Sequence, residues 1–484
     1  MKRSPLKTAA TLLVSTTAFL NAQQVPKSAL QANTTLLYQE QKTVESFSEM
    51  FTEGEFFGRI RSNTFTYIWE QESEAQKNYL VSALGGSVVY KSAKASEISF
   101  GTALYYSHAF FDDSAYPVET LSKAKDLLSR YDYSNTGTKN MAVLGQAYFE
   151  YNGIEKTRVI VGRQLVEGFY TKSNDTKMIP NTFDGVVLQN DYFEDTQIQL
   201  AYLVKQKLRD HTQAHSVLMY GDANLTSHTN PQWSQNDDSA MHRGLTYTAL
   251  KAAGVSTEAP LITGDLSNSS IKNLEVDLSF YYVPELLSEV MAELNYEMAF
   301  DGFSVTPGVR YIRQIDDKAG EVGGAAYNGS ATSLLGYKDP NSLDSQMIAA
   351  RVVLKTHSYK LNLAYTQVMD EADLVTPWRG FPTSGYTRSM ARYNWQANTK
   401  SYRIELVKDA NEIAGLYKNT FMQLSVLHTD ADESKAYFDE NYYYAGFVQN
   451  PSKSFQWRLR LGYQDTKKVD SDGLDGRLEF DYLF

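Results

Sequence analysis

Apolar and polar residues alternate with a period of two along most of the chain after about residue 54. The segment 453–466 is a clear case, because Trp457 and Leu459 stand at odd positions while Arg458 and Arg460 stand at even ones. Successive side chains of a β-strand point to opposite faces of the sheet. The alternation therefore predicts strands with one apolar face and one face suited to water.

Segments with this alternation recur along the chain, and breaks rich in Asn, Asp, Gly and Ser separate them. Together they predict an all-β protein with about 18 strands. The clearer strands are expected at 56–67, 139–152, 156–166, 194–208, 271–283, 285–300, 302–315, 345–369 as a hairpin, 399–410, 417–429, 453–466 and 474–484. The weaker candidates are 78–91, 95–111, 182–190, 243–252 and 436–448.

Long and short breaks between these strands alternate. The long breaks are 111–138, 166–182, 208–242, 316–344 and 370–398. The short ones lie near 152–155, 190–194, 300–302, 356–358, 411–416 and 449–453. Long outer loops, short periplasmic turns and an even strand number are typical of bacterial outer-membrane barrels. We therefore predict a transmembrane antiparallel β-barrel over residues 52–484, into which the region 243–270 fits least well.

The N-terminus has the pattern of a secretory signal peptide over residues 1–22. Lys2, Arg3 and Lys7 precede a run of small and apolar residues that ends at Ala22. Removal of this segment takes away three basic residues and no acidic one, so the net charge changes from −11 to −14. Residues 23–51 are polar, and we expect one short amphipathic helix in them.

Composition narrows the classes of function. The chain has no Cys, which excludes disulfide frameworks, thiolate metal sites and cysteine nucleophiles. Its acidic balance argues against a nucleic-acid partner, for which a basic patch is expected. The aromatic share of 13%, with 34 Tyr, fits the aromatic girdles of a membrane barrel.

Two nearby segments, 156–164 (KTRVIVGRQ) and 174–186 (NDTKMIPNTFDGV), carry a family resemblance. The first is similar to the fifth strand and the second to the third loop of the OprD-type porins of the outer membrane. Weaker similarity extends over most of the mature chain. Lys177 stands where family members more often carry Arg, and an acidic Asp184 precedes Gly185.

The resemblance implies an 18-stranded barrel, monomeric or homotrimeric, whose third extracellular loop folds into the lumen and narrows it. At this constriction we expect Asp175 and Lys177 to meet the channel, with Pro180 and Phe183 bracing it. The resemblance also implies a track of lumen arginines. Strand parity directs the following basic side chains to water: Arg59, Arg61, Arg158, Arg310, Arg351, Arg403, Arg458 and Arg460, with Lys355 and Arg477.

Two interpretations of these arginines stay open. A guanidinium group binds a carboxylate in a bidentate manner, and basic rings select anions, so the set can form a track for anionic solutes. Acidic residues also face inward by parity, so the arginines can equally form an ion-paired lining. The inward acidic residues are Glu150, Glu293, Glu297, Glu405, Glu479 and Asp481.

Other chemistry is weakly represented in the sequence. His211 and His215 have a metal-ligand spacing but no third ligand nearby, and the turn at 470–475 lacks the Glu of a calcium loop. We therefore predict no catalytic residue, no metal site and no cofactor. The expected function is a porin of the bacterial outer membrane, in contact with its lipid, for passive diffusion of small hydrophilic solutes that include carboxylates such as amino acids. A structural or adhesive surface barrel and an outer-membrane hydrolase are the alternatives.

Overall fold

The computed structural model describes residues 41–73, 76–112, 126–129, 132–133, 136–218, 244–327, 335–390, 392–410, 419–452 and 454–484. The predicted signal peptide 1–22 and the part 23–40 of the predicted polar segment lie outside the described residues. No helix in the described ranges is long and apolar enough to cross a membrane.

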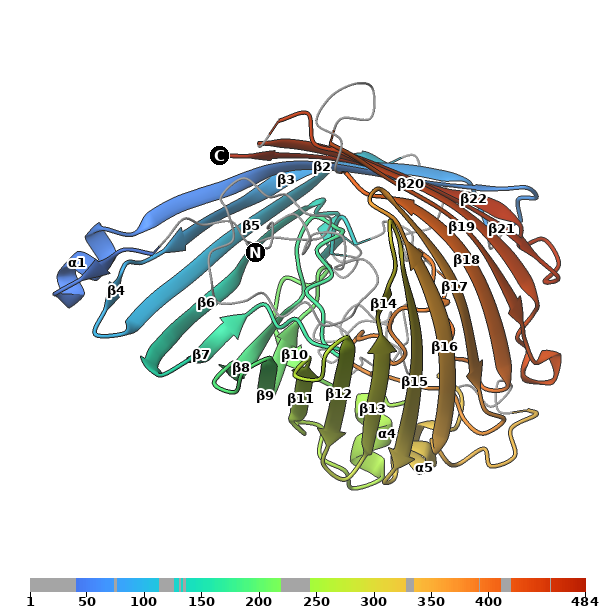
Figure 1. Cartoon of the computed structure of the whole chain (residues 1–484). Helices are drawn as coiled ribbons and strands as arrows, with labels where there is room; N and C mark the ends of the chain where they lie inside the picture. Colours follow the sequence, from blue (N-terminus) through green and yellow to red (C-terminus); the bar gives the residue numbers. More distant parts are fainter. Residues whose placement is uncertain are drawn as a thin grey trace.

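In the described part of the chain, eighteen long strands form one antiparallel barrel (Figure 1). Each strand pairs with the next along the chain, and the last pairs with the first from Arg59 opposite Leu483 to Trp69 opposite Gly473, which closes the barrel. The strands are β2 (Glu55–Trp69), β3 (Tyr79–Lys91), β5 (Ile98–Asp112), β6 (Asn140–Ile154), β7 (Thr157–Gln164), β8 (Thr182–Asn190), β9 (Thr196–Lys207), β11 (Leu261–Asn268), β12 (Leu274–Val283), β13 (Leu287–Tyr296), β15 (Ser304–Asp316), β16 (Ser345–Lys355), β17 (Tyr359–Val368), β18 (Thr399–Lys408), β19 (Thr420–Asp430), β20 (Glu440–Gln449), β21 (Phe455–Thr466) and β22 (Gly473–Leu483).

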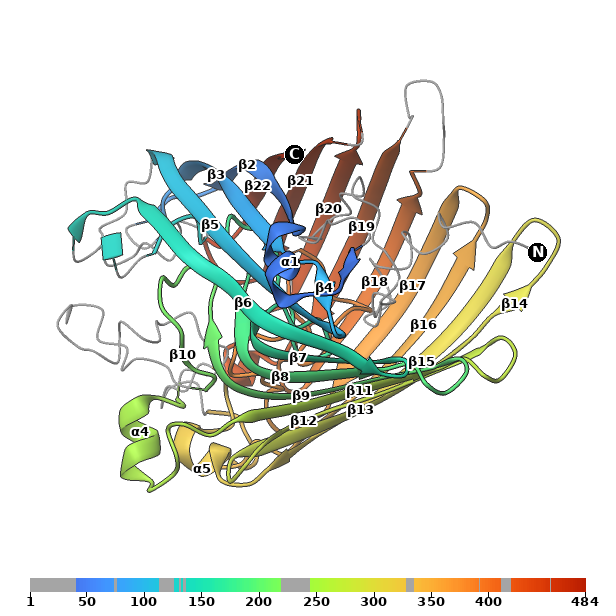
Figure 2. The same ribbon diagram turned by 90° about the vertical axis from the view of Figure 1, so that its left-hand side faces the viewer.

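Short strands and helices lie at the two ends of the barrel. The short strands are β1 (Thr43–Val44), β4 (Lys94–Ala95), β10 (His215–Ser216) and β14 (Met298–Ala299). The helices are α1 (Phe47–Thr52), α4 (Tyr247–Ala252), α5 (Ala319–Gly323) and the 3-10 turn η5 (Glu433–Lys435). Figure 2 shows α4 and α5 at the end that carries the long connections, which we call the outer end.

The predicted barrel and its strand number are confirmed, with one strand misplaced. Residues 243–252 were expected to form a strand, but 247–252 form α4, where the side chain of Thr246 accepts a hydrogen bond from the backbone N–H of Ala249 at 3.1 Å. The missing strand is β11, which pairs with β9 and β12. The whole stretch 208–260 is therefore one outer loop, and the periplasmic turn that follows is only 269–273.

The outward face of the barrel is apolar. Ile60, Leu104 and Val309 are about half exposed in the isolated chain, although they are large hydrophobic side chains. Aromatic residues gather at both ends of this face. Those toward the outer end include Tyr106, Tyr282, Tyr311, Tyr402 and Tyr443, and those toward the periplasmic end include Phe56, Phe149, Tyr296, Phe300, Tyr359 and Phe484. An apolar band between two aromatic girdles is the surface that a lipid bilayer requires.

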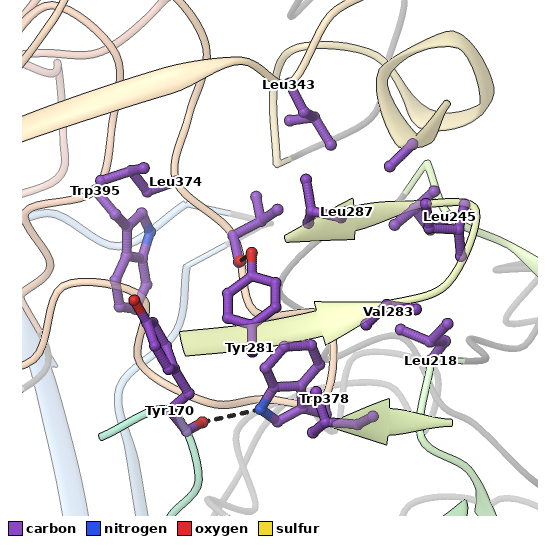
Figure 3. Close-up of a cluster of buried hydrophobic side chains, with 14 of the residues drawn as sticks. Tyr170, Leu218, Leu245, Tyr281, Val283, Leu287, Leu343, Leu374, Trp378 and Trp395 are labelled. Atoms are coloured by element: carbon purple, nitrogen blue, oxygen red, sulfur yellow. Dashed lines mark hydrogen bonds between the residues drawn. The ribbon is translucent and has the colours of Figure 1, made fainter. Parts of the chain in front are cut away.

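Described residues of several outer loops pack inside the barrel, as predicted for the third loop. We name the outer loops by order: L2 (113–139), L3 (165–181), L4 (208–260), L6 (317–344), L7 (369–398) and L8 (431–439). Tyr170 of L3 packs with Tyr281, Trp378 and Leu287 in one buried cluster (Figure 3). Met178 of the same loop lies in a second cluster with side chains of β2, β3 and β5. L3 therefore crosses the interior between two opposed hydrophobic clusters.

Candidate functional site in the barrel lumen

The middle of L3 is tied to the inner wall at β2 by Asp175. Its carboxylate accepts hydrogen bonds from Arg59 Nη1 at 2.7 Å, Arg59 Nη2 at 3.0 Å and Arg61 Nη1 at 2.8 Å. Arg61 Nε also donates to Asp481 of β22 at 2.7 Å. All four side chains are almost completely buried, so these two arginines hold L3 in place.

The other L3 residues singled out in the sequence lie around this anchor. Lys177 Nζ lies 3.7 Å from Asp126 of L2 and 4.2 Å from the ring centroid of Phe65. Pro180 is buried just before β8, and Phe183 on β8 is 1% exposed within the first hydrophobic cluster. Lys177 therefore links L3 to L2, while Pro180 and Phe183 lie where they can support the C-terminal end of L3.

L7 also folds into the barrel, which the sequence analysis did not predict. Trp378 Nε1 donates to the backbone oxygen of Tyr170 in L3 at 2.9 Å (Figure 3). Arg379 Nη1 pairs with Asp210 of L4 at 2.7 Å, and Arg310 Nη1 donates to the backbone oxygen of Thr383 at 2.7 Å. The signal that could have revealed this is compositional, because L7 has two Trp and two Tyr in a region treated as an outer loop.

Six of the eight proposed track arginines are held firmly by acidic partners. In addition to Arg59 and Arg61, these are the neighbours Arg310 and Arg351, and the separate residues Arg158 and Arg458. Arg310 Nε and Arg351 Nη2 share Glu293, at 2.6 and 3.0 Å, and both guanidinium groups lie over the ring of Tyr386. Arg158 pairs with Glu150 at 2.7 Å, and Arg458 pairs with Glu479. For these residues the geometry favours the ion-paired lining.

The two remaining arginines of the track are less fully neutralised. Arg403 pairs with Glu405 and donates to the backbone oxygen of Tyr386 at 3.0 Å. Arg460 lies 3.9 Å from Glu479, a carboxylate that Arg458 already engages, and its cross-strand neighbour is Arg477. Both side chains keep about a tenth of their surface exposed, although they face the barrel interior.

Arg388 of L7 is a third arginine whose charge is not fully neutralised, like Arg403 and Arg460. The sequence analysis did not single it out. Its guanidinium carbon lies 3.7 Å from the centroid of Phe381 and 5.7 Å from that of Tyr393, with no carboxylate within ion-pair distance in the described residues. Burial and the nearby Arg209 and Arg477 lower the pKa of Arg388 to about 10. The group therefore stays charged at neutral pH.

We call Arg388, Arg403, Arg460 and Arg477 the basic cluster. Arg388 is close enough to Arg403 and Arg477 to interact electrostatically, and Arg460 is close enough to Arg477. Arg477 itself pairs with Asp475, with Nε at 3.0 Å from Oδ1. Because these four arginines outnumber their carboxylate partners, the cluster carries an excess of positive charge.

No arrangement for metal binding is found among the described residues. His211 and His215 do lie together in L4, with ring centroids 4.8 Å apart.

Comparisons with known proteins bear on the fold. No protein-family model matches the sequence, and no curated protein matches it. The structure is similar to OccAB1 of Acinetobacter baumannii, with a TM-score of 0.68 and 14% identity over 90% of this chain and 97% of that one. It is similar to OccK9 (OpdG) of Pseudomonas aeruginosa, with a TM-score of 0.67 and 14% identity over 90% and 99%. It is also similar to OpdK of the same species, solved with vanillate, with a TM-score of 0.65 and 11% identity over 90% and 99%.

These solved structures are outer-membrane porins of the OprD/Occ type. The fold of this chain is therefore that of an 18-stranded porin. The resemblance found in the sequence is confirmed at the level of the fold, and the neighbours in fold are channels rather than enzymes.

Proposed function

We propose that this protein is a passive channel of the bacterial outer membrane for small hydrophilic solutes and that it favours those bearing a carboxylate. The observation that carries the proposal is the basic cluster inside a closed barrel. A channel needs groups that bind a solute weakly enough to release it. Arg388 has no carboxylate within ion-pair distance among the described residues, and Arg460 lies 3.9 Å from Glu479, so these two can bind a solute without losing a close partner.

The lumen arginines fall into two groups, those that position loops and those of the basic cluster, and this separation supports the proposal. Arg59, Arg61, Arg310 and Arg351 position L3 and L7, which narrow the lumen. The basic cluster lies beside these loops and remains partly exposed, since Arg403 and Arg460 keep about a tenth of their side-chain surface exposed. A guanidinium group offers two parallel N–H donors to a carboxylate, which makes this anion class the best match.

The narrowing by two loops limits the solutes to small molecules, and the exposed apolar band places the barrel in a membrane. Transport is passive, since the barrel supplies only a path and a charge pattern. We propose a monomer or a homotrimer surrounded by outer-membrane lipid. The presence of vanillate, a carboxylate, in the structure of OpdK agrees with the proposed solute class.

The test is single-channel recording of refolded protein in planar bilayers, with the reversal potential measured under a potassium chloride gradient and with benzoate or glutamate as blocker. The variants are Arg388→Gln and Arg460→Gln. The matched control is Arg163→Gln, because Arg163 lies on the outward face and pairs with Asp184 at 2.6 Å. One unit charge at about 6 Å in water-like surroundings contributes roughly 0.7 kcal/mol, or about a threefold change in anion affinity.

We expect an anion-selective wild type, with selectivity and carboxylate block each reduced about threefold by either lumen variant and unchanged in the control. Cation selectivity of the wild type would contradict the proposed solute class. Absence of conductance from folded protein would contradict the channel itself and favour an adhesive or structural barrel.

A further inference from the structure

Helix α1 is attached to the outside of the barrel at its periplasmic end. The side chain of Ser46 accepts a hydrogen bond from the backbone N–H of Glu49 at 3.1 Å, and the carboxylate of Glu49 accepts one from the backbone N–H of Ser46 at 3.3 Å. This capping box stabilises a helix of only six residues. Tyr90, on the outward face of β3, donates its hydroxyl to the backbone oxygen of Phe51 at 2.7 Å. The helix therefore lies against the wall that the membrane surrounds.

Between α1 and this wall is a pocket with a volume of about 490 Å³. Phe47, Met50 and Phe51 of α1 form one side, and Phe149 and Val161 of β6 and β7 are among the residues of the other. The one charged residue that lines it is Glu150, whose carboxylate is engaged with Arg158 and Lys91 at 2.7 Å each. The free surface of the pocket is consequently apolar.

The position of the pocket identifies its occupant. Phe149 and Val161 are 54% and 49% exposed and belong to the same outward face as Leu104 and Leu144, the face that lipid chains contact. The pocket lies at the level of the periplasmic aromatic girdle, where Phe51, Phe100 and Phe149 follow one another with ring centroids 5.2–6.3 Å apart. It is thus a recess in the lipid-facing surface, continuous with the apolar band.

We propose that this pocket binds one acyl chain of a phospholipid of the periplasmic leaflet and that α1 acts as a clip over it. The inference rests on the proposed membrane location. Phe47 of α1 is 57% exposed and extends the apolar lining outward, so the chain can enter from the bilayer without crossing a polar surface. A lipid held in this way differs from the rest of the lipid annulus, because protein covers it on two sides.

The test is native mass spectrometry of the full barrel released from micelles that contain palmitoyl-oleoyl phosphatidylethanolamine. Val161→Trp fills the pocket with a larger side chain, and Met50→Glu places a charge in it. The matched control is Val290→Trp on β13, because Val290 is outward-facing and 46% exposed but lies outside the pocket. Slower gel migration after boiling verifies that each variant has folded as a barrel.

We expect wild type and Val290→Trp each to retain one phospholipid at a collision energy that removes the other bound lipids. Both pocket variants should retain at least about tenfold less. Equal retention by the folded pocket variants and the control would overturn the proposal. The proposal would also be overturned if the pocket variants dissociated from an oligomer to a monomer while their bound lipid stayed the same. The recess would then be a contact between two copies of the chain.

Conductance recordings on the same samples separate this inference from the proposed channel. Retained lipid without conductance would contradict only the channel, and conductance with equal lipid retention in all variants would contradict only the pocket.

Discussion

The anchor of L3 offers the most direct test of how the lumen is built. Asp175 is fully buried and accepts hydrogen bonds from Arg59 and Arg61, two groups that otherwise rely on Asp481 and Glu479. Asp175→Asn keeps the shape of the side chain but removes its charge. Breaking a buried ion pair by neutralising one partner costs about 3–5 kcal/mol, and here two buried arginines lose a carboxylate that both of them engage.

The matched control is Asp184→Asn on β8. Asp184 also forms a bidentate pair, with Oδ1 and Oδ2 at 2.6 and 2.8 Å from Arg163 Nε and Nη2. Its side chain is 25% exposed, however, and it lies on the outward face rather than in the lumen. Both residues lie near the outer ends of β7 and β8, and a charged side chain near a membrane interface costs only about 0–1 kcal/mol. The same substitution should therefore have a much smaller effect at this position.

Urea unfolding of barrels inserted in lipid vesicles measures the free energy of unfolding, and single-channel conductance reports whether L3 still narrows the lumen. We expect the free energy of unfolding of Asp175→Asn to fall by about 3–5 kcal/mol. Its conductance should become larger and noisier as L3 leaves the wall. Its reversal potential should shift in the direction that indicates higher anion selectivity. If both variants lose the same free energy and the conductance is unchanged, Asp175 does not hold L3 and the reasoning is wrong.

Two further predictions concern buried charges and acid. The free energy of unfolding of Glu293→Gln should fall by about 3–5 kcal/mol in the same assay, because two arginines lose their carboxylate. That of Glu289→Gln should not fall, since among the described residues its buried carboxylate forms no ion pair. In L8, burial raises the pKa of Asp432, but hydrogen bonds from Lys435 and Ser434 outweigh it and hold the pKa well below its usual range. A lowered carboxyl pKa stabilises the fold above about pH 4, the unfolded value, and this contribution is lost as pH falls further. Lys435→Met should therefore lower the melting temperature at pH 7, and the difference from wild type should shrink below about pH 4.

The number of strands and the face of each residue could be predicted from the sequence because both depend on local patterns. A strand in a membrane must show apolar side chains to lipid, so the alternation of apolar and polar residues defines the outward face without knowledge of the neighbouring strands. The structure accordingly places Arg59 and Arg310 inside the barrel and Ile60 and Val309 outside. The strand β11 was missed because short loop helices and short strands differ little in such patterns, and α4 occupied the expected position.

What only the tertiary structure decided is which charges neutralise one another. Arg61 and Asp481 are 420 positions apart in sequence, and Arg59 and Asp175 are 116 apart, yet each pair is in direct contact. The alternation in the sequence determined the barrel and the inward side of the arginines, and the resemblance to OprD-type porins implied the inward third loop. The separation of structural arginines from the basic cluster depends on distances of a few ångströms between distant segments, and so does the inward path of L7. Such distances follow from barrel closure and loop packing, which leave no periodic pattern in the chain.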